Sequence, residues 1–149
     1  KGQEIRGKAK ALTGKKQQLY ITGRLGLVID GTGANSAKLL KQKKTLESLG
    51  YECLMVYVNL SLEGSIEADR QRGLDGDRTI GPELVTTKWK ELQSGLDPFR
   101  KSFGKLFFEI DNSVREKTPT LVRKVLNFIV KWSKTMPNNK AAKTWMKNN

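Results

Sequence analysis

The sequence has 149 residues, of which 37% are hydrophobic and 29% are charged, and its formal net charge at pH 7 is +13. This length is enough for one domain with its own core and is short for two. The single cysteine, Cys53, excludes an internal disulfide and a cysteine-rich zinc site, and the absence of histidine excludes Ser-His triads and histidine general bases.

The positive charge is concentrated at the two ends of the chain. Residues 1–24 carry a net charge of +6 and residues 115–149 carry +8, whereas residues 25–114 carry −1. Two basic ends predict attraction to a polyanion, either nucleic acid or an acidic protein partner. The alternative is a pair of well-solvated helices. Every apolar run is too short to cross a bilayer, so we expect no membrane partner.

The N-terminal part of the chain predicts a helix, a strand and a second helix. Residues 3–19 are polar and basic with a few apolar residues on one side, which favours a helix that two glycines weaken. Residues 27–30 form a short apolar run bounded by glycines, which is typical of a parallel strand buried on both faces. A helix is expected over residues 34–49, where Gly50 stops it.

A second buried strand is predicted for residues 51–58, and a helix then runs from residue 61 or 62 to about residue 70. Residues 71–81 are rich in Gly, Asp and Arg and predict a mobile loop. The remaining elements are, in chain order, a helix over 82–93, a connector over 95–104, a third strand over 105–111, an apolar helix over 119–132 and a short helix over 139–147.

Strands that alternate with helices predict an α/β fold, in which a parallel sheet with right-handed crossovers has helices on its faces. About three strands are visible, so part of the sheet is missing or a partner supplies it. We expect residues 1–114 to form the main domain and the basic helices of residues 115–149 to pack on it. The apolar side of the helix over residues 119–132 favours core packing, with docking on a partner as the alternative.

An acidic residue and a glycine-rich turn end the first predicted strand, in the order Asp30-Gly31-Thr32-Gly33. Open α/β sheets bind ligands at the carboxyl ends of their strands. The Asp30 carboxylate is of the kind that holds Mg²⁺ or its waters, and glycines let backbone amides approach an anion. A plain turn is the alternative, since the segment matches neither G-x-x-x-x-G-K-[ST] nor G-x-G-x-x-G.

Arginines gather at the end of the third predicted helix and in the loop that follows. Guanidinium groups on a mobile loop suit phosphoryl transfer, because they neutralise charge on the transferred group and close over a nucleotide. Nearby carboxylates offer the alternative that the arginines are tied up in salt bridges. The arginines are Arg70, Arg72 and Arg78, and the carboxylates are Asp69, Asp75 and Asp77.

The third predicted strand ends in Asp111-Asn112-Ser113. A strand followed by an Asx-type turn explains these residues without a ligand. Together with the two motifs above, however, they place polar groups at the ends of consecutive strands. We therefore expect the three groups to converge at one edge of the sheet.

These features in this order resemble the second half of zeta-toxin-like P-loop kinases, particularly the versions found in tailed bacteriophages. The resemblance covers about residues 8–114 and runs through LVIDGTG, a helix, GYECLMVYVNLSLEGSIEADRQRGLDGDRTIGPELV and FFEIDNS. In that family an acidic-Gly-Thr turn ends a strand, a second strand leads to a helix and an arginine-bearing lid, and a last strand ends in Asp with Asn or Ser. The tail NNKAAKTWM is also similar to the phage versions.

The resemblance implies a kinase-like phosphotransferase domain that uses ATP and Mg²⁺ on a small hydroxyl acceptor such as a sugar nucleotide. Asp30 and Arg78 would be its catalytic residues. The residues implied for the acceptor are Asp30, Gly31, Thr32 and Gly33, with Asp30 also facing the metal. Those implied for ATP are Arg70, Arg72 and Arg78 at the phosphates and Asn112 near the base.

The family's phosphate loop and its catalytic carboxylate are not in this sequence and would lie upstream of Lys1. Without that loop the chain alone is not expected to phosphorylate anything. The alternative function is a non-catalytic phage structural or nucleic-acid-associated protein built on a kinase-derived fold, and a polynucleotide kinase would combine both features. The expected location is the host cytoplasm or the virion.

Overall fold

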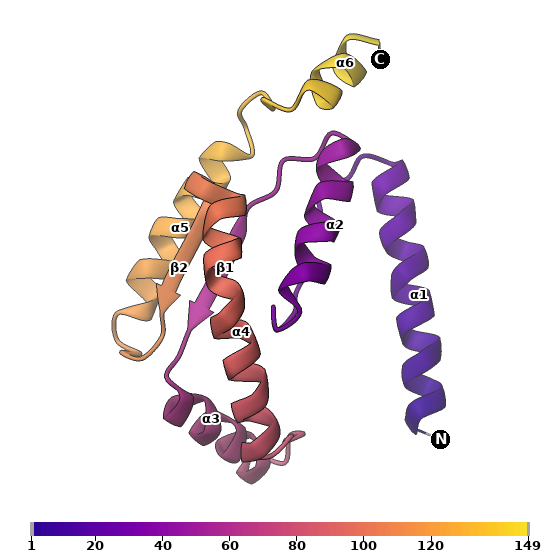
Figure 1. Ribbon diagram of the computed structural model, residues 1–149. Coiled ribbons are helices and arrows are strands. Elements are labelled where there is room, and N and C mark those ends of the chain that lie inside the picture. The colour runs from indigo at the N-terminus through magenta and orange to yellow at the C-terminus, as the bar shows by residue number, and fades with distance from the viewer. Residues whose placement is uncertain (1, 149) are drawn as a thin grey trace. The chain divides into compact units, whose positions relative to one another are not determined.

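The computed structural model describes residues 2–148 and separates them into two compact units, with the boundary after Gly31. Unit 1 contains the helix α1 (Gly2–Thr22), drawn in indigo in Figure 1, and residues 23–31. The predicted basic helix is therefore confirmed. Its described side chains are exposed at all but two positions, since only Gln17 and Ile21 are partly covered.

The strand predicted for residues 27–30 is wrong, because these residues have no regular secondary structure. Val28 is 101% exposed and Ile29 is 51% exposed. A parallel strand is held by backbone hydrogen bonds to a neighbouring strand, and unit 1 contains none within residues 2–31. An apolar sequence alone does not supply that partner.

Unit 2 contains the remaining helices and both strands. Its two strands form a parallel sheet, so the predicted α/β class and parallel pairing are confirmed, although residues 32–148 contribute two strands rather than three. The elements are α2 (Ser36–Ser48), β1 (Met55–Asn59), α3 (Leu62–Leu74), α4 (Pro82–Phe103), a 3₁₀ turn (Gly104–Leu106), β2 (Phe107–Asp111), α5 (Thr118–Trp132) and α6 (Lys140–Asn148).

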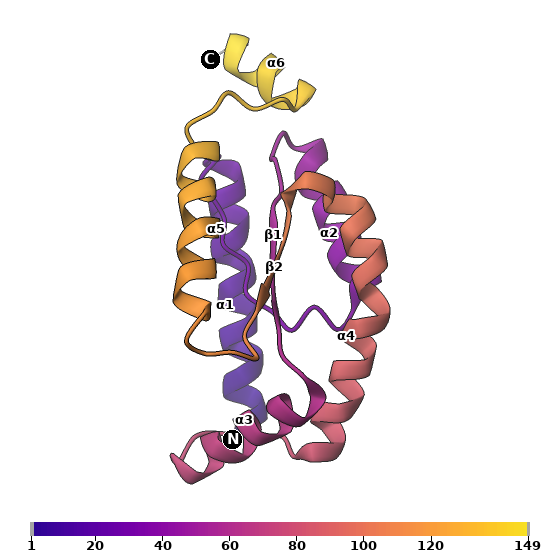
Figure 2. The same ribbon diagram turned by 90° about the vertical axis from the view of Figure 1, so that its left-hand side faces the viewer.

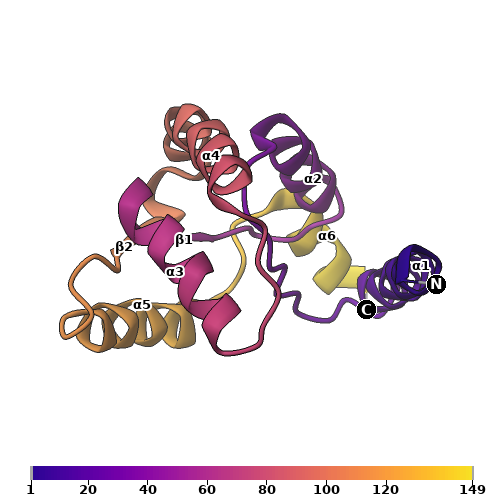
Figure 3. The same cartoon turned by 90° about the horizontal axis from the view of Figure 1, so that it is seen from below.

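The sheet lies between α5 on one face and the pair α2 and α4 on the other, as Figures 2 and 3 show. The register pairs Met55 with Phe107 and Tyr57 with Glu109, and alternate residues of each strand point to the same face. The core lies on the α4 face. It contains Tyr57, Leu96, Phe99 and Phe103, with Leu39, Leu40, Met55 and Phe107 packed against them.

The opposite face of the sheet is covered mainly at β2. Ile110 is buried there, and the rings of Phe108 and Phe128 pack with their centroids 4.8 Å apart. For residues 119–132 the sequence left core packing and docking on a partner open, and this unit shows packing on the sheet. Part of α5 stays exposed, including Leu126 and Val130.

Helix α4 is longer than predicted. The sequence indicated an end near Gln93, whereas the helix continues through Gly95 and Pro98 to Phe103. Leu96, Phe99 and Phe103 follow at helical spacing and are buried, Phe99 completely. Burial of this row outweighs the low helix propensity of glycine and the hydrogen bond that Pro98 cannot donate.

Candidate functional site

The ends of β1 and β2 meet at the carboxyl edge of the sheet. Asn59 and Asp111 are register partners, and the Asn112 backbone N–H donates a 2.9 Å hydrogen bond to the Asn59 carbonyl. The Asn112 side-chain oxygen accepts a hydrogen bond of 2.8 Å from the Thr118 hydroxyl, which fixes the start of α5. The ends of β1 and β2 are therefore neighbours, whereas the convergence of the arginines with Asp111-Asn112-Ser113 stays a prediction.

The residues after β2 form a turn. The Ser113 backbone N–H donates a 2.9 Å hydrogen bond to the Asp111 carboxylate. This bond, followed by one from the Ser113 side chain, lowers the pKa of Asp111 from its ordinary value. The geometry is that of the Asx turn considered as the alternative for this motif.

A buried carboxylate organises the connection between α3 and α4. Asp69 is 9% exposed and accepts hydrogen bonds from two backbone amides, that of Ile80 at 3.1 and 3.2 Å and that of Gly81 at 2.9 Å. Gly81 has φ = +84°, a conformation that favours glycine, and Pro82 then begins α4. We call residues 75–81 the α3–α4 loop. Its C-terminal end is held by one side chain.

The arginines of this region differ in their partners. Arg70 pairs with Glu67 through hydrogen bonds of 2.8 and 2.6 Å, which lower the pKa of Glu67 and raise that of Arg70. Arg72, in the last turn of α3, and Arg78, in the α3–α4 loop, are exposed. Their guanidinium groups make no recorded ion pair or hydrogen bond within residues 2–148.

The nearby carboxylates do not neutralise these arginines. Asp69 binds backbone amides, and Asp75 accepts a hydrogen bond of 3.2 Å from the side chain of Gln71. Arg70 and Glu67 are the one arginine–carboxylate pair recorded between residues 62 and 81. The structure therefore favours available guanidinium groups at Arg72 and Arg78 over salt-bridged ones.

Thr32 lines an open cleft of about 450 Å³ at the N-terminus of α2. Asn35 and Ser36 line the same cleft, and Lys88 and Glu91 reach it from α4, where they form an ion pair of 2.8 Å. The Asn35 side chain accepts a hydrogen bond from the Lys38 backbone N–H and so caps the helix. The cleft thus combines hydroxyl, amide and charged groups.

Three other predicted site residues do not line this cleft. Two of them belong to unit 1 and the third packs against α4. Asp30 and Gly31 belong to the irregular segment of unit 1 and are exposed. Gly33 has φ = +70°, and a Cβ there would lie 3.0 Å from a methyl group of Leu92, so it packs against α4. Within residues 2–148 no group of three or more Asp, Glu or Cys side chains is arranged to hold a metal ion, and Asp30 as a ligand stays a prediction.

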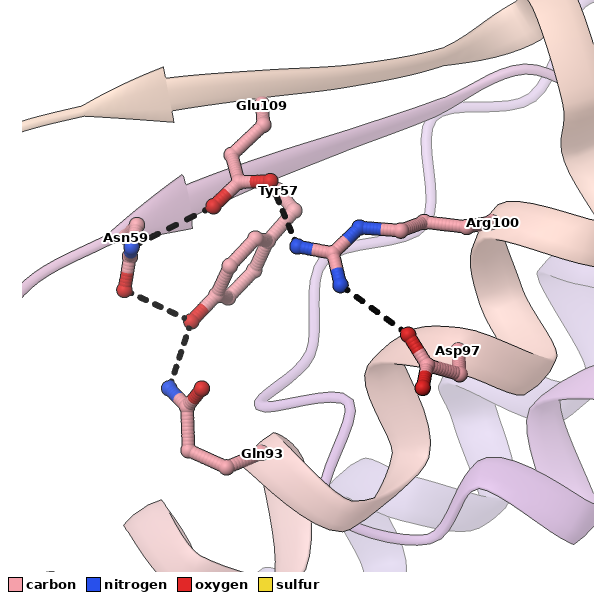
Figure 4. A network of polar contacts seen from close by, with 6 residues as sticks. All are labelled: Tyr57, Asn59, Gln93, Asp97, Arg100 and Glu109. Carbon is pink, nitrogen blue, oxygen red and sulfur yellow. Dashed lines mark hydrogen bonds and ion pairs between the residues drawn. The ribbon is translucent and has the colours of Figure 1, made fainter.

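A polar network between α4 and the sheet was not predicted (Figure 4). The Tyr57 hydroxyl donates to the Asn59 side chain at 3.0 Å and accepts from Gln93 at 3.0 Å, and burial is the main cause that raises the Tyr57 pKa. Glu109 accepts from Asn59 at 3.2 Å and from Arg100 at 2.9 Å. Gln93 and Arg100 are seven residues apart and lie on one face of α4, but the sequence predicted that this helix ends near Gln93. The strand register that brings Glu109 there was not readable from sequence either.

No helix within residues 2–148 combines the length and the apolarity that crossing a bilayer requires. The chain matches no protein-family model, no curated protein and no solved structure.

Proposed function

We propose that this chain carries the arginine lid and part of the acceptor side of a kinase-like phosphotransferase domain. The reaction would transfer a phosphoryl group from ATP to a small hydroxyl acceptor such as a sugar nucleotide. The observation that supports it is the α3–α4 loop. A buried carboxylate holds this loop, and Arg78 in the loop and Arg72 just before it have no recorded partner among the described residues.

The position of the loop suits this role. Helix α3 follows β1 directly, so α3 and the α3–α4 loop lie beyond the carboxyl end of the sheet (Figure 1). Ligands of open α/β sheets bind at that end. Guanidinium groups bind phosphate oxygens through paired, charge-assisted hydrogen bonds, which gives both affinity and orientation.

The residues present fit the nucleotide in part. Arg72 and Arg78 would hold phosphate oxygens, and Thr32 with Lys88 would face the acceptor in the cleft. The Asn112 side-chain oxygen already accepts a hydrogen bond from Thr118, so its amide group is what remains for a base. When bound, ATP supplies the phosphoryl group and Mg²⁺ neutralises charge on the phosphates.

The membership in the zeta-toxin-like kinases and the three-layer fold of that family are part of this proposal. Residues 1–149 contain no G-x-x-x-x-G-K-[ST] sequence, so transfer would need a phosphate loop from outside these residues. The role assigned to this chain is to bind and orient the nucleotide phosphates.

Calorimetric titration of the chain with ATP and Mg²⁺ tests this role. We expect Arg72→Ala combined with Arg78→Ala to weaken ATP binding about tenfold or more, because each lost charge-assisted hydrogen bond is worth about 1.5–3 kcal/mol. Arg123→Ala, which removes an exposed arginine of α5, is the matched control. Equal affinities of the double variant and the control would refute the lid assignment.

A nucleic-acid-associated role without catalysis is the second candidate, and the basic C-terminal part favours it. Asn139 anchors the start of α6, since its side-chain N–H donates to the carbonyls of Glu47 and Tyr51 at 2.8 and 3.2 Å. Lys140, Lys143 and Lys147 then lie exposed on α6. Binding to a DNA duplex that weakens steeply with salt, and that is lost when these lysines are replaced by Gln, would support this role.

A further inference from the structure

Helix α1 carries a row of apolar side chains that nothing in unit 1 covers. Ile5, Leu12 and Leu19 follow at intervals of seven residues and are 66%, 57% and 69% exposed. Residues seven apart lie on one face of a helix, after nearly two complete turns. Unit 1 offers no second helix or strand within residues 2–31 on which this row can pack.

Basic side chains border this apolar row on both sides. Lys8 and Lys15 lie three residues after Ile5 and Leu12, and Lys16 lies four residues after Leu12. The only acidic residue of α1 is Glu4, which is already paired with Lys8 at 2.8 Å. The surface is therefore an apolar seam between positive flanks. We call it the α1 seam.

Helix α1 also contains two residues of low helix propensity. Gly7 and Gly14 lie on the side away from the α1 seam, and each costs about 1 kcal/mol relative to alanine in a helix interior. Nucleation of an isolated helix is unfavourable, and most helices in proteins are stabilised by packing an apolar face. A partner along the seam would supply that packing.

The basic side chains beside the apolar row distinguish between the kinds of partner that could pack on it. Pairing with a second copy would set lysines against lysines along the sides of the seam. A nucleic-acid backbone does not use the apolar row, and a lipid surface favours a wide apolar face rather than one residue width. A helix with apolar residues at the same spacing and acidic residues beside them matches both the apolar row and the basic side chains of α1.

We infer that the α1 seam binds an acidic amphipathic helix of another protein, with Ile5, Leu12 and Leu19 in the apolar contact. Lys8, Lys15 and Lys16 would pair with carboxylates of that helix. Such flanking charges set partner choice in helix pairs. The inference does not depend on the phosphotransferase proposal, because no residue of the α3–α4 loop enters it.

Fluorescence anisotropy with the complete chain tests the inference, using two labelled synthetic peptides as long as α1. One peptide carries leucines at the spacing of the seam with glutamates beside them, and the other has the same composition in scrambled order. We expect the first peptide to bind about tenfold tighter or more. Leu12→Gln, which keeps helix propensity nearly constant, should remove this difference.

Matched variants separate the seam from general charge. Lys15→Gln should weaken binding of the seam peptide, whereas Lys10→Gln, on the far side of α1, should change it little. Gly14→Ala should tighten it, since it favours the helix without touching the seam. Equal binding of both peptides would overturn the inference. So would preferred binding to duplex DNA or to anionic phospholipid vesicles that Lys10→Gln and Lys15→Gln weaken alike and Leu12→Gln leaves unchanged.

Discussion

Two short apolar segments with similar sequences have different fates in this chain. Residues 27–30 and the strand β1 are both runs of large apolar side chains ending in a polar residue, and both were predicted as buried strands. β1 pairs over five residues with β2 and is covered by α4. Residues 27–30 stay irregular, and all but Leu27 are exposed.

The difference shows that strand formation here depends on a neighbouring strand and on apolar side chains that cover the segment. β1 finds a strand and a row of aromatic side chains within unit 2, including Phe99, Phe103 and Phe107. Unit 1 offers residues 27–30 one helix and no strand within the described residues. Backbone pairing and apolar cover are supplied by the tertiary structure, not by the segment.

The largest expected effect tests this comparison directly. Phe99→Ala removes the completely buried ring between α4 and the sheet and should lower the free energy of unfolding by about 3–5 kcal/mol. Val28→Ala should change it by less than about 0.5 kcal/mol, because Val28 is exposed. Urea denaturation followed by circular dichroism measures both. If Val28→Ala lowered the free energy of unfolding as much as a core substitution does, residues 27–30 would be packed. The contrast with β1 would then be wrong.

The α3–α4 loop is a second irregular segment, and it differs from residues 27–30 because a side chain holds it. Asp69→Ala would leave the amides of Ile80 and Gly81 without their acceptor and should cost about 1–3 kcal/mol. Hydrogen exchange of these two amides should become faster. Asp77→Ala, at an exposed position of the same loop, is the control and should leave exchange unchanged. Equal exchange in both variants would contradict the role of Asp69.

Helix glycines of the two units, Gly95 in unit 2 and Gly14 in unit 1, should respond differently to substitution. A Cβ at Gly95 would lie 2.8 Å from the Cβ of Ser36, so Gly95→Ala should push α2 away from α4 and cost about 1–3 kcal/mol. A Cβ at Gly14 would meet nothing within 4 Å, so Gly14→Ala should stabilise α1 by up to about 1 kcal/mol. Thermal melts and the helical circular dichroism signal distinguish the two. A loss of stability with Gly14→Ala would mean that α1 is closely packed.

The smallest expected effect concerns the carboxyl edge of the sheet. Hydrogen bonds from Ser113 lower the folded-state pKa of Asp111 below its ordinary value of 3.8. The ionised carboxylate therefore stabilises the folded chain above pH 3.8, and this contribution is lost as the pH falls through the lower folded-state pKa. A carboxyl-carbon NMR titration should give Asp111 a pKa below 3.8. A pKa at or above that value would contradict the turn at the end of β2.

The sequence located most elements of unit 2 because their signals are local. The apolar runs at β1 and β2, Pro82 at the start of α4 and Gly50 after α2 act on the nearest residues in the chain. It misplaced the end of α4, since the burial of Phe99 and Phe103 depends on the sheet beneath. The hydrogen bonds from Ile80 and Gly81 to Asp69 were missed because they span eleven and twelve residues.

By itself, the sequence determined the α/β class, the parallel direction of β1 and β2, the basic character of both ends and the arginines near the α3–α4 loop. The tertiary structure decided that residues 27–30 are not a strand, that Arg72 and Arg78 have no recorded partner among the described residues, and that Tyr57, Gln93 and Glu109 share one network. The physical reason is the distance along the chain over which each effect acts. Propensity, periodicity and charge act over a few neighbouring residues, whereas burial, register and ion pairing depend on groups that only the fold brings together.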